Sequence, residues 1–410
     1  MVGQQAQQFP ARIPAGTCYR DRRDHIHEYA PQCMAMQVRI GRRGFAPALQ
    51  YRQVASTVWN SREVNLAVLK SRKTNELSAL ARNGHHGLME SPGTAAGQEL
   101  AFDNNTRLEW VDLPVQVRAG IEDLLGSAVV TAENQRGGFS PGMAARVRCT
   151  DGRRAFVKAA GQAVNPHTPG IYRTEANVMR QLPARVPAPA MRGSYDDGEW
   201  VALIFDEVPG SPPQQPWTSD ELRLVLDALA DMSRALTPCP IDDVAKASDE
   251  LRADMLCYRE LASAPPADLD PWERRHLDRL ADLAASALDH LDGDTLVHLD
   301  IRADNVLFDA ARAWFVDWPW ACRGAVWIDS VMLLLDAANH GIDPDPIVAE
   351  HPLLTDVAPD HITAFIAGLC GYFALHSRRP APQGLPTVRS FQRAKHVTTL
   401  EWVRRRTGWN

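Results

Sequence analysis

The residues best suited to chemistry lie in segment 298–305, which reads His-Leu-Asp-Ile-Arg-Ala-Asp-Asn. A carboxylate at Asp300 could orient an acceptor hydroxyl and take its proton. Asn305 offers a neutral oxygen ligand for Mg²⁺, and Asp317, which follows the apolar stretch 314–316, offers a second oxygen ligand. A carboxylate beside a hydroxyl and oxygen ligands for Mg²⁺ are the parts that phosphoryl transfer from a nucleotide requires.

Three features upstream stand in the order in which a nucleotide site would need them. A glycine-rich turn lies between two predicted strands and could bring backbone N–H groups close to phosphates, although a lone Gly-Gly pair is more often a plain hairpin. Its candidate residues are Gly137, Gly138, Phe139 and Ser140. Lys158 follows the apolar stretch 155–157, and Glu175 lies seventeen positions later in a predicted helix. The strand predicted over 200–206 leads into Glu207-Val208-Pro209-Gly210.

The pattern H-x-D-x-x-x-x-N at 298–305, followed by the strand-ending Asp317, resembles the signature of the aminoglycoside phosphotransferase family. That family is a branch of the protein-kinase-like superfamily, and the resemblance covers about residues 108–410. It implies an α+β, protein-kinase-like fold with a small antiparallel-sheet N-lobe, one helix in that lobe, and a larger helical C-lobe. It also implies ATP and Mg²⁺ as cofactors.

The resemblance assigns roles residue by residue. Asp300 is the catalytic carboxylate, and Asn305 and Asp317 hold the metal. Lys158 holds the α- and β-phosphates and Glu175 orients it. The carbonyl of Asp206 and the N–H of Val208 read the adenine as a hinge between the lobes.

Two further residues are expected to support the loop, and one departs from the family. His298 braces the loop by hydrogen bonds, and Asp329 caps the next helix and fixes the loop. Asp304 stands where many relatives have glycine. Its carboxylate adds negative charge near the metal or acceptor, or it caps the loop, and Arg302 is placed to balance it.

The segment after Asp317 indicates what kind of acceptor is phosphorylated. Only eleven residues separate Asp317 from Asp329, and none is Ser, Thr or Tyr. Protein kinases have a long phosphorylatable segment here, ending in A-P-E. The expected acceptor is therefore a hydroxyl of a small molecule, either an aminoglycoside-type antibiotic or a metabolite. A catalytically silent nucleotide- or metabolite-binding protein and, less favoured, a protein kinase stay open as alternatives.

The acceptor pocket is expected in the helical lobe. Acidic residues would help to bind a polycation, and four are candidates: Asp304, Asp343, Asp345 and Glu350. The tryptophans at 318, 320 and 327 are expected to pack in the core rather than to stack on a ligand. The basic segment 402–406 is expected to be a solvated helix end.

Three parts must position these residues. Residues 1–105 are polar, with little periodicity, and are expected to form a low-order extension. Residues 106–208 are expected to form the nucleotide-binding lobe and 209–410 the catalytic lobe. Apolar patterns and caps predict helices at 114–125, 172–182, from Thr218 to Leu236, from Asp270 to Leu288 and at 362–375, and strands at 128–134, 144–149, 155–159 and 200–206.

Composition excludes several classes of protein. The hydrophobic fraction of 45% and charged fraction of 23% fit a soluble globular chain. The net charge of −6 argues against a nucleic-acid partner. The seven cysteines form no C-x-x-C pair, which indicates free thiols in the cytoplasm. The N-terminus shows no apolar leader, and no stretch is long enough to suggest a membrane partner. A monomer or weak dimer is expected.

Overall fold

The computed structural model describes residues 107–135, 138–139, 141–309 and 312–410. The extension predicted for 1–105, with Cys18 and Cys33, lies outside the described residues, and so do Gly137 and Ser140 of the glycine-rich turn. The five cysteines in the described part of the chain are buried and carry no disulfide. Among the helices that the structure describes, none combines the length and the apolar character that a membrane span needs.

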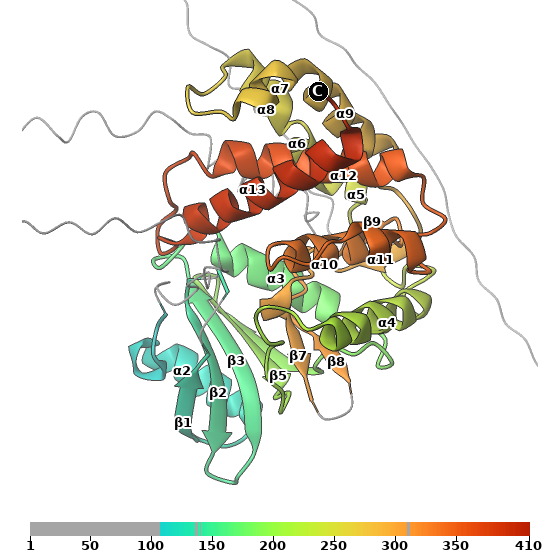
Figure 1. The fold of residues 1–410 in the computed structure, drawn as a ribbon. Helices are drawn as coiled ribbons and strands as arrows, with labels where there is room; N and C mark the ends of the chain where they lie inside the picture. The colour runs from blue at the N-terminus through green and yellow to red at the C-terminus, as the bar shows by residue number, and fades with distance from the viewer. Residues whose placement is uncertain (1–106, 136–137, 140, 310–311) are drawn as a thin grey trace, which may run out of the picture. The chain divides into compact units, whose positions relative to one another are not determined.

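The N-lobe is built on one antiparallel sheet of five strands in the order β1-β2-β3-β5-β4 (Figure 1). Its strands are β1 (Val129–Asn134), β2 (Met143–Cys149), β3 (Arg154–Gly161), β4 (Met191–Asp196) and β5 (Trp200–Asp206). Four of the five follow the sequence prediction. The fifth, β4, was missed because it is a polar edge strand, Met-Arg-Gly-Ser-Tyr-Asp, with no apolar alternation.

Helices cover both faces of this sheet, because side chains alternate between the faces along each strand. Helix α2 (Val115–Leu125) follows the short helix η1 (Trp110–Asp112) and packs with Val157 and Ile204 in one core. Helix α3 (Thr168–Met179) packs against β3 and β5 on the other face, where Leu203 and Phe205 point.

The boundaries of α3 differ from the prediction of 172–182. The Asn165 carboxamide oxygen accepts hydrogen bonds from the backbone N–H groups of His167 and Thr168, at 2.9 and 3.1 Å. The N-cap of α3 is His167, whose side chain makes no capping bond, so Asn165 supports the turn just before the helix. The helix begins at Thr168 and ends at Met179.

The C-lobe is mainly helical and is organised around α12 (Pro359–His376), the predicted buried helix, which packs against α6, α7, α9 and α13. The other helices are α4 (Ser219–Ala235), α5 (Ala247–Glu250), α6 (Arg252–Met255), α7 (Cys257–Ser263), α8 (Pro271–Arg275), α9 (Leu277–Ser286), η2 (Ala287–Asp289), η3 (Ala303–Asn305), α10 (Ile328–Ala338), α11 (Asp345–Glu350) and α13 (Val388–Thr407). The capping box of Thr218 and Glu221 is confirmed at the start of α4.

Two predictions about this lobe are wrong in detail. The helix expected from Asp270 to Leu288 is divided into α8 and α9, because His276 leaves helical geometry with φ −110° and ψ 13°. The C-terminal segment is not a solvated end: Trp402 is buried, and Arg404 and Arg406 pair with Asp270 and Asp345.

Two short antiparallel strand pairs position the catalytic loop. Strand β6 (Thr295–Val297) pairs with β9 (Cys322–Gly324), and β7 (Val306–Phe308) pairs with β8 (Ala313–Phe315). The loop joins β6 to β7, and Asp317 lies just beyond β8. Because the Val316 N–H donates to the Asn305 carbonyl at 3.0 Å, the two ligand candidates come from adjoining backbones.

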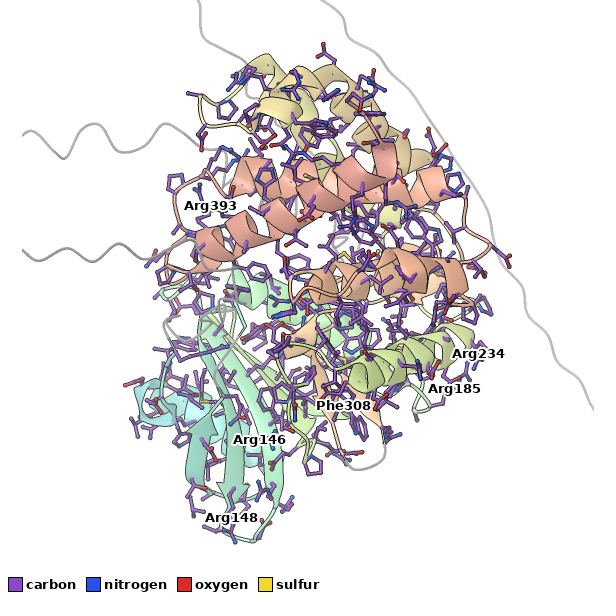
Figure 2. All side chains as sticks on the ribbon, viewed as in Figure 1. Arg146, Arg148, Arg185, Arg234, Phe308 and Arg393 are labelled. Atoms are coloured by element: carbon purple, nitrogen blue, oxygen red, sulfur yellow. The ribbon has the colours of Figure 1, made fainter. Side chains whose placement is uncertain are left out.

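The connection between the lobes is fixed to both of them. Arg146 on β2 donates to the Gly210 carbonyl at 2.8 Å and pairs with Glu207 at 3.0 Å, while the Ser211 N–H donates to the Phe308 carbonyl at 3.0 Å (Figure 2). A Cβ added to Gly210 would lie 2.5 Å from the Phe308 oxygen. Glycine is therefore required where this segment crosses β7.

Candidate active site

The structure brings Asp300 and Asn305 into direct contact. The Asn305 amide nitrogen donates to the Asp300 backbone carbonyl at 2.8 Å and to its carboxylate Oδ2 at 3.0 Å. The Asp300 side chain keeps 25% of its surface exposed, while Asn305 is buried. The loop therefore presents one accessible carboxylate, held from behind by the asparagine.

Lys158 on β3 links the sheet of the N-lobe to Asp317 in the C-lobe. Its Nζ donates to Glu175 Oε1 and to Asp317 Oδ1, each at 2.8 Å. Burial is the largest influence and would lower the pKa of Lys158, but the charges of Asp317 and Glu175 outweigh it, so the pKa lies above its usual value. The lysine thus carries a positive charge between two carboxylates from different lobes.

Asp317 is held in an unusual backbone conformation. Its φ is +69°, and Leu299 in the loop has φ +66°; both lie in the left-handed region that residues other than glycine rarely adopt. Such conformations persist where surrounding contacts impose them, and they cluster at functional sites. The Asp317 side chain pairs with Lys158 and keeps 25% of its surface exposed.

Burial opposes the ionisation of Asp317 and is the largest influence on it. The nearby charge and hydrogen bond of Lys158 outweigh burial and hold the pKa of Asp317 below its usual value. Glu175 behaves differently: burial dominates and raises its pKa despite the same lysine. Of the two carboxylates, Asp317 is therefore the one that ionises more readily and is better suited to bind a cation.

His298 lies buried under the loop and braces it at two points. The Asp300 N–H donates to His298 Nδ1 at 3.2 Å, and His298 Nε2 lies 3.0 Å from the Val316 carbonyl. Burial, the largest influence, lowers the pKa of His298. A neutral ring satisfies both contacts if Nε2 carries the proton, so the histidine links the loop to the segment that carries Asp317.

Asp329 holds the start of the loop. Its Oδ2 accepts the N–H of His298 and its Oδ1 accepts the N–H of Leu299, both at 2.8 Å. The expectation that Asp329 caps its own helix is wrong: the N-cap of α10 is Trp327, whose side chain makes no capping bond. Asp329 lies inside the first turn, and its carboxylate reaches across to the loop instead.

Arg302 lies between two carboxylates of the loop. Its Nε is 3.3 Å from Asp300 Oδ1 and 3.2 Å from Asp304 Oδ1. The expected balance of Asp304 by Arg302 is therefore present. Burial is the largest influence on Asp304 and raises its pKa to about 6. The Arg302 guanidinium also lies over the rings of Phe139 and Phe391, at 5.1 and 5.7 Å.

The remaining nucleotide candidates lie at the N-lobe side. Gly138, with φ +74°, and Phe139 are the described residues of the glycine-rich turn. Asp206 ends β5 and directs its carboxylate to Arg192, and Val208 is buried. Their backbone roles toward adenine stay predictions.

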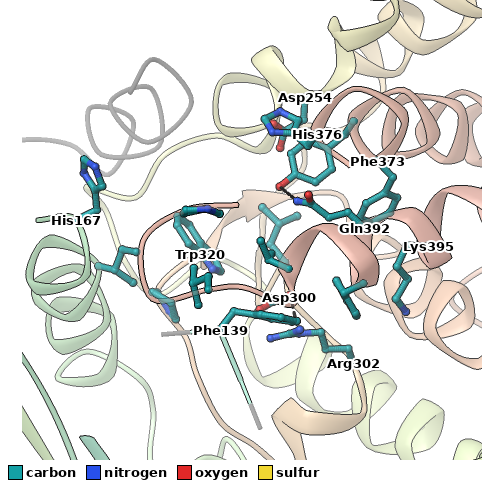
Figure 3. A pocket seen from close by; sticks show the side chains of 18 of the residues that line it. Phe139, His167, Asp254, Asp300, Arg302, Trp320, Phe373, His376, Gln392 and Lys395 are labelled. Carbon is teal, nitrogen blue, oxygen red and sulfur yellow. Dashed lines mark hydrogen bonds and ion pairs between the residues drawn. The ribbon is translucent and has the colours of Figure 1, made fainter. Parts of the chain in front are cut away.

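A cavity of about 830 Å³ opens beside Asp300 (Figure 3). Asp300 and Arg302 lie on one side of it, and Asp254 and His376 lie across from them in this view. Besides Asp300, Asp317 and Asp336, three acidic residues of α5 and α6 line it: Asp249, Glu250 and Asp254. Basic residues line it too, and they are Arg252, Arg302, Arg389 and Lys395. The apolar lining includes Trp320, Leu369, Tyr372, Phe373 and Phe391.

The acidic residues predicted for the acceptor pocket do not line this cavity. Asp343 and Asp345 pair with arginines of α13, Asp304 pairs with Arg302, and neither these three nor Glu350 lines the cavity. Spacing gave no signal for the observed lining, because it comes from many segments between Phe139 and Lys395. The preference for core tryptophans holds for Trp318 and Trp327, which are buried, but Trp320 faces the cavity.

A second cluster with metal-ligand chemistry lies away from the cavity. Glu273, Cys370 and His396 place their ligand atoms within 4.8 Å of one another. However, Glu273 Oε1 already lies 3.0 Å from His396 Nε2 and accepts the Tyr258 hydroxyl at 2.7 Å. We interpret this cluster as a buried hydrogen-bond network that joins α7, α8, α12 and α13.

Comparison with known proteins agrees with this geometry. Residues 138–393 match the model of the phosphotransferase enzyme family. An aminoglycoside 3'-phosphotransferase of Streptomyces ribosidificus is 30% identical over 133 residues, which are 30% of this chain and 47% of that protein. One from Streptomyces fradiae is 28% identical over 148 residues, 35% of this chain and 51% of that protein. The chain thus spans about half the length of the curated relatives it matches.

The fold is shared with solved structures of low sequence identity. A thermostable mutant of the aminoglycoside phosphotransferase APH(4)-Ia, in complex with ADP and hygromycin B, has a TM-score of 0.51 at 16% identity. The match covers 72% of this chain and all of that one, 100%. Another mutant, with AMP-PNP and hygromycin B, gives 0.50 at 17% identity, covering 71% of this chain and 98% of that one. The expected kinase-like α+β fold is confirmed.

Proposed function

Since the chain belongs to the phosphotransferase enzyme family, that of the aminoglycoside phosphotransferases, we propose that it transfers the γ-phosphoryl group of ATP to a hydroxyl of a small molecule. One observation carries the proposal. Lys158 from the sheet and Asp317 from beyond β8 meet at 2.8 Å, while Asn305 and Asp300 meet on the adjoining loop. These contacts support a site in which Lys158 would hold phosphates, Asn305 and Asp317 would offer oxygens to a metal, and Asp300 would act as the base.

The nucleotide would lie between the lobes that we assign to residues 106–208 and 209–410. Lys158 would hold the α- and β-phosphates, with Glu175 fixing its direction. Gly138 and Phe139 belong to the turn that would cover the phosphates, together with Gly137 and Ser140. The backbone carbonyl of Asp206 and the N–H of Val208 would bind adenine.

The donor set fits Mg²⁺. Both amide hydrogens of Asn305 are taken by the carbonyl and carboxylate of Asp300, which leaves its carboxamide oxygen as the atom for a cation. Asp317 is the carboxylate whose pKa is lowered. Mg²⁺ prefers such oxygens and commonly uses one or two protein carboxylates beside phosphate oxygens. When bound, it would neutralise charge on the transferring phosphoryl group.

Asp300 would orient the acceptor hydroxyl and accept its proton as the phosphorus–oxygen bond forms. Asn305 donates to one oxygen of this carboxylate and Arg302 faces the other, so its direction is fixed before the acceptor enters. Such positioning supplies much of the rate acceleration in phosphoryl transfer, because the transition state is loose.

The cavity beside Asp300 supports a small-molecule acceptor. Its volume of about 830 Å³ lies within the range of sites for small ligands. Acidic residues on α5 and α6 would suit a polyamine such as an aminoglycoside, and the aromatic wall would suit a ring-bearing metabolite. We propose action in the cytoplasm as a monomer or weak dimer, without a nucleic-acid or membrane partner.

An ATP-consumption screen of the full chain against aminoglycosides, macrolides, amino alcohols and sugars tests this function. We expect ATP turnover that depends on one acceptor class, with a phosphorylated product found by mass spectrometry. A nucleotide-dependent thermal shift without product across the library would favour a silent binding protein. Autophosphorylation or labelling of a protein would favour a protein kinase.

A further inference from the structure

Helix α10 presents two carboxylates to the catalytic loop, not one. Asp329 and Asp336 are seven residues apart, which places them about two turns apart on one face of the helix. Asp329 accepts the N–H groups of His298 and Leu299 at the start of the loop. Asp336 Oδ2 accepts the N–H of Ala303, near the end of the loop, at 3.0 Å.

Asp336 is itself held by two distant residues. Lys395 on α13 donates from Nζ to its Oδ1 at 2.5 Å, and Trp217, which precedes α4, donates from Nε1 to its Oδ2 at 3.1 Å. The Lys395 and Asp336 side chains are 4% and 8% exposed. Both oxygens of the carboxylate are thus occupied in a nearly dry environment.

The ionisation of Asp336 depends on this partner. Burial, the largest influence, would raise the pKa of Asp336, but the charge and hydrogen bond of Lys395 and the donors from Ala303 and Trp217 bring the pKa below its usual value. Buried ion pairs often add little stability compared with apolar residues of the same volume. A gain in stability therefore explains the Asp336–Lys395 pair poorly. The hydrogen bond from the Ala303 N–H to Asp336 explains it better, because it connects the pair to the catalytic loop.

Ala303 occupies a decisive position in the loop. It begins η3, the single turn that delivers Asn305, and the Asn305 N–H donates to the Arg302 carbonyl at 2.9 Å within that turn. Asn305 in turn contacts the Asp300 carboxylate at 3.0 Å. Anchoring the Ala303 N–H thus sets the direction of Asn305, and through it the direction of Asp300.

We propose that Asp336 is a positioning residue for phosphoryl transfer and that Lys395 holds it in place. Asp329 fixes one end of the loop and Asp336 the other, so α10 acts as a two-point clamp, with α13 securing the second point. This inference rests on the proposed function for its effect on turnover, but the contact itself can be tested without any activity.

Two double variants separate positioning from folding. Asp336→Asn with Lys395→Gln removes both charges and keeps an oxygen to accept the Ala303 and Trp217 donors. Asp336→Leu with Lys395→Met also removes both charges but leaves the Ala303 N–H without an acceptor. Because neither variant buries a lone charge, both are expected to fold.

Turnover should distinguish the two. The Leu/Met variant is expected to lose about 100-fold in kcat, since small misplacements of catalytic groups cost that much. The KM for ATP should change little. The kcat of the Asn/Gln variant should stay within about fivefold of the wild-type value. A small loss is expected because a neutral oxygen accepts a hydrogen bond somewhat more weakly than a carboxylate.

Amide hydrogen exchange of peptides covering 298–305 provides the readout that needs no acceptor. We expect faster exchange at the Ala303 end in the Leu/Met variant, unchanged exchange at His298 and Leu299, and near-normal exchange in the Asn/Gln variant. Tyr258→Phe, which weakens the remote buried network of the C-lobe, is the matched control and should leave loop exchange unchanged.

Equal exchange and equal kcat in all variants would overturn the clamp. A silent protein with altered Ala303 exchange would instead reject the proposed function and keep the contact. Parallel losses in the Asn/Gln and Leu/Met variants would show that the charge pair serves folding and would also overturn the positioning role.

Discussion

The catalytic loop and the helical wall lie on different sides of the cavity beside Asp300, and they are built in different ways (Figure 3). The loop is eight consecutive residues, and buried side chains hold its backbone at His298, Leu299, Asp300 and Ala303. The wall gathers side chains from α5, α6, α12, α13 and the segment after Asp317. The reactive side chains of the loop thus come from one sequence segment, whereas those of the wall come from several helices.

This difference divides the two tasks of the enzyme that we propose. Chemistry requires fixed geometry, which a short loop with buried polar partners provides. Acceptor choice requires variable shape and charge, which side chains on separate helices can change without moving the loop. Changes in the loop should therefore affect turnover or stability, and changes in wall residues that do not support the loop should affect acceptor affinity alone. Asp336 and Lys395 line the cavity but support the loop, so they belong with the loop.

The largest effect is expected from Asp317→Asn. It removes the carboxylate that pairs with Lys158 and that would bind Mg²⁺, so kcat/KM should fall by about 10³-fold or more. Titration of Mg·AMP-PNP by calorimetry should show weaker nucleotide binding with a lost Mg²⁺ dependence. Unchanged Mg²⁺-dependent binding would remove Asp317 from the metal site.

Asp329→Ala should mainly cost stability. Two buried N–H groups lose their acceptor, and each unsatisfied donor costs about 1–3 kcal/mol, so the free energy of unfolding should drop by about 3 kcal/mol in urea titrations. Asp343→Ala, which removes a surface pair with Arg405 and an exposed hydrogen bond from the Asp345 N–H, should change it by less than about 1 kcal/mol. Similar values for the two variants would contradict the view of a loop held by buried contacts.

Asp304→Asn should change how stability depends on pH. The pKa of Asp304 is raised to about 6 in the folded protein, so the folded state binds more protons than the unfolded state between about pH 4 and 6. The stability of the wild type should therefore fall as pH rises through this window, by about 2 kcal/mol relative to the variant, which cannot ionise. Parallel pH profiles would show that Asp304 ionises normally.

The smallest effect should come from the wall. Trp320→Ala should raise the KM for the acceptor about tenfold, which corresponds to the loss of about 1.4 kcal/mol of contact, with kcat and the KM for ATP unchanged. Trp314→Ala is the matched control, since Trp314 on β8 does not line the cavity. A drop in kcat from Trp320→Ala would break the proposed division between loop and wall.

The same contrast explains what could be predicted from sequence. The loop, Lys158 and Asp317 could be predicted because each ends or follows a short apolar stretch that forms a strand. Glu175 could be predicted because the family resemblance assigns it a place in the helix that follows Lys158. The contacts among these residues follow from the kinase-like fold. Asp336 and Lys395 were missed because an aspartate and a lysine on two helices, 59 positions apart, carry no local signal.

The cavity lining was missed for a related reason. Asp249, Glu250 and Asp254 lie on two four-residue helices, too short to show an amphipathic pattern. They join the lining only because α6 packs against α12 and α5 packs against β9. Acidic residues closer to the loop in sequence, such as Asp343 and Asp345, seemed better placed but serve to pair with the arginines of α13. Distance along the chain is a poor guide where the site is made by helices.

The most direct test of the central claim compares the full wild-type chain with Asp300→Asn under single-turnover conditions, using γ-labelled ATP and the acceptor found by the screen. We predict that label passes to the small molecule in the wild type. In the variant the rate should fall by about 10²- to 10⁴-fold, the usual contribution of a catalytic base, while Mg·AMP-PNP binds with similar affinity. Transfer at the wild-type rate by Asp300→Asn would contradict the account.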